Sequence, residues 1–398
     1  MATPSSTDPR SGGSDRGGRA GRLSGTLEAI RGRYLAPARV IPRSPAAIRQ
    51  LAGSLLDSYR AADTAQTRPS ALGIEVSDAC NLACAVCSRE IAWDRRGSPF
   101  LRLDPFRRIF DPIRPLYLVL SGYGEPLLNR DLPAMVAHAS AAGTRVTVIT
   151  NGTLLDEARA RALREAGLAK LKVSLDGAEP DAYAKHRAGG DLHAVLANVE
   201  RFHRDRSGGW PLLEIQMVLF RENLDQAARL LRLCRDRLPG VQPFFLVMFT
   251  YGEQPGFVEK TIPFNDPAGL AAIEEAAALA RESGFHRTLG SLEAARRQLT
   301  VDLSRAPCYV PWYSSIVSID GELFPCCYQS IRGVSVGNVL QDGFEAVWNG
   351  ERMRAFRAGL RERRCGDKVC ATCGYQDGPM ASAFRLVGGS PRHGGGGG

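Results

Sequence analysis

The chain has 398 residues, enough for one large domain with one or two smaller ones, and its 44% hydrophobic and 23% charged residues are typical of a globular protein. The absence of an apolar run of about 18 residues, and of an apolar signal-peptide core, argues against a membrane span or secretion and favours the cytoplasm. The net charge of +9 comes almost entirely from scattered arginines, so a nucleic-acid partner is not favoured.

The composition changes along the chain and divides it into five segments. Residues 1–25 and 388–398 are rich in Gly, Ser and Arg, which predicts disorder at both ends. Residues 26–70 show helical periodicity and are expected to form a helical extension. Residues 71–290 are expected to form the core domain, and residues 300–386, which hold six of the ten cysteines, a small C-terminal domain.

Short apolar runs alternate with amphipathic stretches from residue 71 onward. The apolar runs predict strands at 72–77, 116–122, 144–152, 168–177, 212–220 and 244–252, and the amphipathic stretches predict helices at 130–143, 155–167, 191–205 and 222–236. Such an alternation implies right-handed crossovers and a parallel sheet with buried strands. The sheet could close as a barrel, curl into a partial barrel or lie open, and in each case ligands should lie at the C-terminal ends of its strands.

Polar residues cluster where the predicted strands end. In chain order they are Cys80, Cys84 and Cys87; Gly122, Gly124 and Glu125 of "GYGEP"; Asn151; Ser174 and Asp176; Asn223; and Glu253. Three cysteines in a C-x3-C-x2-C pattern with no nearby histidine differ from a structural zinc site, which normally closes four ligands around the metal. Ten cysteines in an intracellular chain favour metal or redox chemistry over a disulfide framework.

The cysteine pattern followed by the "GxGEP" segment resembles the radical S-adenosylmethionine (SAM) superfamily over residues 71–260. The resemblance implies a partial (β/α)6 barrel with a [4Fe-4S] cluster held by Cys80, Cys84 and Cys87. In the family, SAM binds the fourth iron and is cleaved to a 5′-deoxyadenosyl radical that abstracts hydrogen from the substrate. An external electron donor such as flavodoxin or ferredoxin is implied as a partner.

The resemblance also implies roles for the other polar residues. Glu125, with Gly122 and Gly124, would bind the SAM amino group, and Arg187 would bind the SAM carboxylate. Ser174 and Asp176 would meet the ribose or the sulfonium, and Asn151 and Gln216 would line the pocket. The residue before the third cysteine, often aromatic in the family, is Val86. The plainer alternatives are core thiols, a surface carboxylate at Glu125 and an exposed helix arginine at Arg187.

The C-terminal cysteines form a second group. "IVSIDGELFPCC" predicts a hairpin with its turn at Asp320–Gly321, and residues 344–360 predict one amphipathic helix. The group resembles the SPASM and twitch extensions of radical SAM enzymes, which hold auxiliary [4Fe-4S] clusters. The resemblance implies one such cluster on Cys308, Cys326, Cys370 and Cys373, with Cys327 and Cys365 in reserve. A zinc ribbon on the same thiolates is the alternative.

Three classes of function fit these features. The favoured one is oxidation or epimerisation of a small natural-product intermediate, such as an aminocyclitol, sugar or nucleoside. The second is modification of a ribosomally made peptide, which the lack of a predicted leader-binding hairpin in residues 26–68 disfavours. The third is a non-enzymatic metal-binding protein. The sequence does not identify the catalytic side chain; the candidates are Cys327, Cys365, Tyr309, Tyr313 and Glu253.

Overall fold

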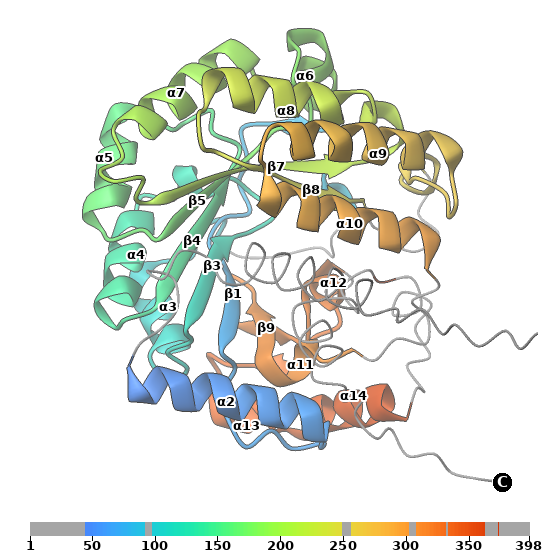
Figure 1. The fold of residues 1–398 in the computed structure, drawn as a ribbon. Coiled ribbons are helices and arrows are strands. Elements are labelled where there is room, and N and C mark those ends of the chain that lie inside the picture. Colours follow the sequence, from blue (N-terminus) through green and yellow to red (C-terminus); the bar gives the residue numbers. More distant parts are fainter. Residues whose placement is uncertain are drawn as a thin grey trace, which may run out of the picture.

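The fold is built on a nine-stranded sheet with the strand order β11-β10-β9-β1-β3-β4-β5-β7-β8 (Figure 1). The computed structural model describes residues 44–91, 98–248, 256–301, 308–331, 333–362 and 373. The candidate residues Glu253, Cys365 and Cys370 lie outside this part of the chain.

Six parallel strands form the core of the sheet, at the positions that the apolar runs predict. They are β1 (Ala71–Glu75), β3 (Tyr117–Ser121), β4 (Arg145–Thr150), β5 (Lys170–Ser174), β7 (Leu212–Leu219) and β8 (Pro243–Val247). Strands β1 and β8 do not pair with each other, so the sheet curls without closing. The architecture is therefore the partial barrel that the resemblance implies.

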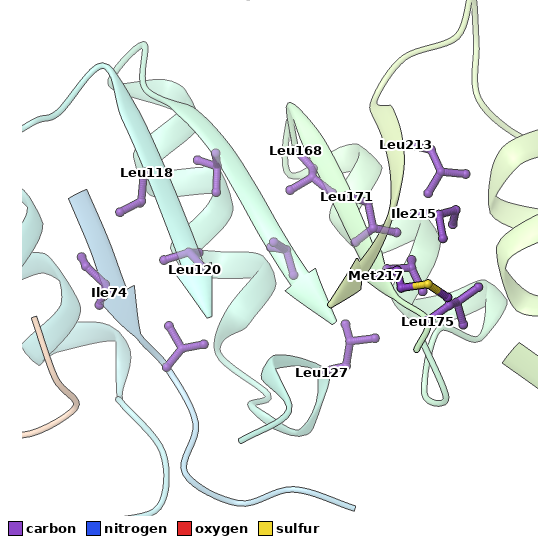
Figure 2. Close-up of a cluster of buried hydrophobic side chains, with 14 of the residues drawn as sticks. Ile74, Leu118, Leu120, Leu127, Leu168, Leu171, Leu175, Leu213, Ile215 and Met217 are labelled. Atoms are coloured by element: carbon purple, nitrogen blue, oxygen red, sulfur yellow. The ribbon is translucent and has the colours of Figure 1, made fainter. Parts of the chain in front are cut away.

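Helices cover the convex face of the sheet (Figure 1). They are α3 (Leu103–Phe110), α4 (Leu132–Ala141), α5 (Glu157–Glu165), α6 (Pro180–His186), α7 (Leu192–Arg204) and α8 (Gln226–Arg237). In α7, Val195, Val199 and Phe202 are buried at helical spacing, and the side chain of Asp191 caps the first turn. Figure 2 shows the apolar side chains of the strands, among them Leu118 and Ile215, that meet these helices.

Two further helices, α9 (Pro267–Glu282) and α10 (His286–Thr300), follow β8. Helix α10 bonds directly to the edge of the sheet. Ser291 Oγ accepts a hydrogen bond of 3.1 Å from Phe245 N, and Thr288 Oγ1 donates one of 2.7 Å to Pro243 O. These bonds satisfy groups of β8 that a neighbouring strand would otherwise pair, which protects the edge.

The C-terminal segment extends the sheet at its other edge. Strand β9 (Ser314–Val317) pairs in parallel with β1, and β10 (Glu322–Phe324) and β11 (Gly337–Asn338) follow in antiparallel fashion. The predicted hairpin is present, with Gly321 at a φ of +88° in its turn. One sheet therefore runs through both the core domain and the expected C-terminal domain.

The predicted helix at 344–360 is wrong in one respect, because it is two helices, α13 (Phe344–Trp348) and α14 (Glu351–Arg361). The break falls at Asn349. Its side-chain amide accepts from Ala65 N and donates to Ala65 O, both at 3.0 Å. An asparagine paired with a distant backbone in this way is better placed at a helix end than in a helix interior.

The N-terminal and C-terminal segments pack together beneath the barrel (Figure 1). Helix α2 (Pro45–Arg60) lies against the short helix α11 (Val310–Tyr313). The guanidinium of Arg357 is fully buried, donates to Pro311 O at 3.0 Å and Asp63 O at 3.1 Å, and stacks on Trp348 with 4.4 Å between charge and ring centre. The described part of the predicted helical extension therefore packs against the C-terminal helices.

In the described ranges no helix is both long and apolar enough to cross a bilayer.

Candidate functional site

The first three cysteines lie on the loop that follows β1, at the C-terminal ends of the strands. A two-residue strand in this loop, β2 (Ala83–Cys84), pairs with β6 (Arg187–Ala188), which places Cys84 opposite Arg187. Ala85 N donates to His186 O at 3.0 Å, and Lys260 Nζ donates to Ala85 O at 2.7 Å. The loop is therefore fixed by two other segments of the chain, residues 186–188 and Lys260.

The cysteine thiols are half-buried and influence one another. The pKa of Cys84 is raised to about 11, chiefly by burial; Arg187 opposes the shift, and the nearby thiols of Cys87 and Cys80 add to it. Burial also raises the pKa of Cys87. Because thiolates are the metal ligands, positive charge has to replace the protons, and several irons would supply that charge.

Three cysteines beside one arginine form a donor set that fits a three-thiolate [4Fe-4S] cluster. Among the described residues, no three His, Cys, Asp or Glu side chains are spaced to hold a single metal ion. A cluster presents a different iron to each thiolate, so its ligands need not converge on one point.

The glycines of "GYGEP" allow its loop to lie against the cysteine loop. A Cβ atom on Gly122 would lie 2.4 Å from Ser77 O, and one on Gly124 would lie 2.2 Å from Ala79 O. Gly124 N and Glu125 N donate to the same two carbonyls, each at 2.8 Å. The contact of these glycines with SAM stays a prediction, and the structure shows that the close approach of the two loops already requires glycine at both positions.

Glu125 is 2% exposed, and its carboxylate bonds to neighbouring segments at the C-terminal ends of the strands, which we call the rim of the barrel. It accepts from Leu127 N at 2.9 Å, from Thr150 Oγ1 at 2.6 Å and from Asn151 N at 2.7 Å. Burial raises the pKa of Glu125, and these hydrogen bonds oppose the shift. The carboxylate joins the start of η2 (Pro126–Leu128) to the end of β4. Its direct contact with SAM stays a prediction.

Asn151 connects the end of β4 to the cysteine loop. Its Nδ2 donates to Asn81 Oδ1 at 3.0 Å, and Asn81 Nδ2 donates to Thr153 Oγ1 at 2.8 Å. Asn81 was not among the expected site residues, although its position directly after Cys80 could have indicated it.

Asp176 and Arg187 form a buried ion pair at the rim. Asp176 Oδ2 lies 2.6 Å from one terminal guanidinium nitrogen and 2.9 Å from Nε of Arg187, and Asp176 Oδ1 accepts from Val218 N at 3.0 Å. The charge of Asp176 keeps the pKa of Arg187 above its usual value in spite of burial. Asp176 therefore fixes the position of the positively charged guanidinium. The N–H groups of Arg187 that do not bond to Asp176 have the geometry to donate to a carboxylate.

Ser174 and Gln216 are opposite one another on β5 and β7 and are half-buried. Beside the third cysteine, Val86 packs against an apolar group that sequence reasoning missed, formed by Phe220, Met248 and Phe257. These side chains lie far from Val86 in sequence, so no local pattern could have associated them with it.

One segment of the second cysteine group, the helix that begins at Cys327, lies close to the first group. The cysteines Cys308, Cys326, Cys327 and Cys373 are half-buried. Helix α12 (Cys327–Ile331) lies against η1 (Ser88–Ile91), the segment that follows Cys87. Tyr123 Oη of "GYGEP" and Ser330 Oγ of α12 are 3.3 Å apart.

The two tyrosines proposed as catalytic candidates pack together near the N-terminal helix. Tyr309 is 4% exposed and forms a small apolar cluster with Tyr313 and with Leu55 of α2. This geometry favours a packing role for both.

Comparisons with known proteins agree with this architecture. Residues 74–234 match the model of the radical SAM superfamily, and residues 308–374 match that of the SPASM iron-sulfur cluster-binding domain. The PqqA peptide cyclase of Streptomyces rochei is 29% identical over 340 residues, covering 82% of this chain and 88% of that protein. The PqqA peptide cyclase of Rhodopseudomonas palustris is 30% identical over 345 residues, covering 80% and 84%.

Two further similarities are more distant. The AdoMet-dependent heme synthase of Methanosarcina barkeri is 27% identical over 326 residues, covering 77% of this chain and 91% of that protein. The crystal structure of Streptococcus suis SuiB bound to precursor peptide SuiA superposes with a TM-score of 0.58 at 15% identity, covering 77% of this chain and 70% of that one. At this identity the structural match shows a shared fold.

Proposed function

The chain belongs to the radical SAM superfamily and carries a C-terminal iron-sulfur cluster-binding domain, and on that premise we propose that it modifies a ribosomally made peptide. Its cofactors are a [4Fe-4S] cluster, an auxiliary cluster and SAM. The observation that carries the proposal is that two relatives, 29% and 30% identical over about four-fifths of the chain, are named peptide cyclases. By the same reasoning, the reaction would join two parts of the peptide by a new covalent bond.

This proposal corrects the expectation from sequence. The favoured substrate was a small natural-product intermediate, and the favoured reaction a dehydrogenation or epimerisation. The named activity of the relatives contradicts that substrate and does not support either reaction type. The lack of a predicted hairpin in residues 26–68 was a poor argument, because an extended peptide can lie along a surface without a dedicated docking fold.

The residues of the chain would have the following roles in this reaction. Cys80, Cys84 and Cys87 would hold the first cluster, and Cys308, Cys326, Cys370 and Cys373 the auxiliary one. The bound cluster and SAM supply the one-electron chemistry that activates a C–H bond. Arg187, held by Asp176 at 2.6 Å, would orient the carboxylate of SAM. Phe220, Met248 and Phe257 would exclude water beside Cys87.

Mass spectrometry of the peptide product tests the proposal. The protein, reconstituted anaerobically with iron and sulfide, would be incubated with SAM, reduced flavodoxin and the short peptide encoded nearest its gene. A crosslink between two residues replaces two bonds to hydrogen, so the product should lose two mass units and resist fragmentation between the joined residues. An unchanged peptide, or one of unchanged mass with an inverted residue, would contradict the proposal.

A further inference from the structure

The inner face of the barrel carries a compact group of charges that the proposed chemistry does not use. Glu214 on β7 is 4% exposed and lies among three cations. Lys172 Nζ is 2.8 Å from its Oε1, while Lys170 Nζ at 3.4 Å and Arg287 at 3.3 Å approach its Oε2. We name these four residues the inner charge group.

Strand geometry places this group inside the barrel. Alternate residues of a strand share a face, and Leu171 and Val173 of β5 are buried on the face that packs against the helices. Lys170 and Lys172 therefore point the other way. Their side chains are 22% and 20% exposed, and that of Arg287 is 27% exposed, so none of the three cations is fully buried.

Within the described part of the chain, Glu214 is the one carboxylate that pairs with these three cations, which leaves two positive charges uncompensated in a partly desolvated environment. The three cations lower the pKa of Glu214 to about 2 in spite of its burial, and burial lowers the pKa of Lys170. A single ion pair or an apolar side chain would serve stability at least as well, because desolvating a charge is costly. The excess charge is best explained by a ligand that brings the missing negative charge.

The choice of lysine supports this reading. The chain has five lysines, Lys170, Lys172, Lys185, Lys260 and Lys368, among 51 basic residues. Two of the five stand two positions apart on the inner face. An ammonium group on a flexible stem can turn from Glu214 to a second carboxylate with less geometric constraint than a guanidinium.

We propose that the inner charge group binds a carboxylate of the substrate, which the proposed function makes an acidic peptide side chain or a peptide C-terminus. Ser174 is the last residue of β5, at the rim, and Lys172 precedes it by two residues. This spacing places Lys172 roughly 6.6 Å further from the rim along the strand. A side chain entering from the rim can therefore reach Lys172 while its backbone stays beside the cofactor site. The ring of Phe244, 5.0 Å from Lys172 Nζ, supplies a wall for the aliphatic part of that side chain.

The test uses three synthetic probes with the reconstituted holoenzyme and SAM, without reductant so that no turnover occurs. The probes are Ac-Ala-Ala-Glu-Ala-Ala-NH2, the same peptide with Gln in place of Glu, and that Gln peptide with a free C-terminal acid. Calorimetry gives their affinities, and mass spectrometry gives the rate of Lys172 acetylation by acetic anhydride with and without each probe. Lys185, 61% exposed on α6, is the internal control for acetylation.

We expect a peptide carrying a carboxylate to bind about tenfold tighter than the neutral one and to slow acetylation of Lys172 but not of Lys185. Tighter binding of the Glu peptide identifies a side-chain carboxylate, and tighter binding of the free acid identifies a C-terminus. Lys172→Gln should abolish the preference, and it leaves Glu214 paired with Lys170 and Arg287, so the fold should persist. Lys185→Gln should retain the preference.

Failure of this inference can be told apart from failure of the peptide proposal. Equal affinity for all three peptides would refute the carboxylate site and leave the peptide proposal standing. Glutarate, a small dicarboxylate, is added to the acetylation experiment as a fourth probe. Protection of Lys172 by glutarate, with no binding of any peptide, would support the carboxylate site and count against a peptide substrate. A preference that survives in Lys172→Gln, or no protection by any probe, would overturn the inference.

Discussion

The two cysteine regions are held in place by different means. Cys80, Cys84 and Cys87 share one short loop, which bonds to the "GYGEP" loop, to β6 and to Lys260. The described C-terminal cysteines lie on segments tens of residues apart, from Cys308 to Cys373. Cys308, Cys326 and Cys327 lie close in sequence to β9 and β10, which join the sheet through the pairing of β9 with β1, and Pro311, three residues after Cys308, accepts from the buried Arg357. The first region is thus organised by neighbouring loops, and the second by contacts between the ends of the chain.

This difference implies that the two regions should fail differently when perturbed. A change in the first region should abolish chemistry and leave the fold. A change in the packing beneath the barrel should loosen the second region and leave the first cluster in place.

The largest effect is expected from replacing Cys80, Cys84 and Cys87 together with Ala. Two four-iron clusters would give about eight irons per chain, and the triple variant should retain about four. SAM cleavage should be abolished, because the cluster that binds SAM is gone. Iron analysis and chromatographic detection of 5′-deoxyadenosine measure both outcomes. A triple variant that still cleaves SAM would show that the loop is not the cluster site.

The same contrast explains what the sequence could predict. The six strands and the helices α4, α5, α7 and α8 follow from local periodicity, and the cysteine triplet and "GYGEP" are continuous motifs, so the sequence could predict them. The short helices α3 and α6 were not predicted. The Val86 contacts with Phe257 and Met248, the break at Asn349 and the pairing of β9 with β1 depend on residues far apart in sequence. The substrate class was wrong because no motif in the chain states it.

The second effect concerns Arg357. Arg357→Ala would leave Pro311 O and Asp63 O without their donor in the interior and would remove the cation from the ring of Trp348. We expect a loss of about 3 kcal/mol in the free energy of unfolding, measured by denaturant titration. Iron bound by the C-terminal cysteines should fall while iron on the first cluster stays. Arg354→Ala, an exposed position on the same helix, should change stability by less than about 0.5 kcal/mol.

The third prediction tests how strongly the thiol of Cys84 is shielded from water in the apoprotein. Burial raises the pKa of Cys84 from 9.0 to about 11, so at pH 8 its thiolate fraction should be about a hundredfold below that of an ordinary thiol. Alkylation of the apoprotein by iodoacetamide should be slow at Cys84 and accelerate about tenfold per pH unit until the pH approaches 11. Peptide mapping measures the rate. Alkylation of Cys84 as fast as that of a free peptide thiol at pH 8 would contradict the buried environment.

The fourth effect is expected at Glu125. Glu125→Ala removes the acceptor for Thr150 Oγ1 and Asn151 N, so the end of β4 should lose its fixed position beside the cysteine loop. SAM affinity should fall about tenfold, which corresponds to the loss of roughly one charge-assisted hydrogen bond. The iron content should stay unchanged. Calorimetry with the unreduced enzyme measures the affinity. The exposed Glu157→Ala on α5 is the control and should bind SAM normally.

The smallest effect is expected where the two regions meet. Tyr123 Oη and Ser330 Oγ are 3.3 Å apart, and they link the "GYGEP" loop to the helix that begins at Cys327. A double-mutant cycle with Tyr123→Phe and Ser330→Ala should give a coupling energy of about 0.5–1.5 kcal/mol, that of one neutral hydrogen bond. Each single variant should keep both clusters, since neither removes a thiol. A coupling near zero would mean that the two regions are stabilised independently, and that the packing around Arg357 and the pairing of β9 with β1 hold the C-terminal cysteines without help from the rim.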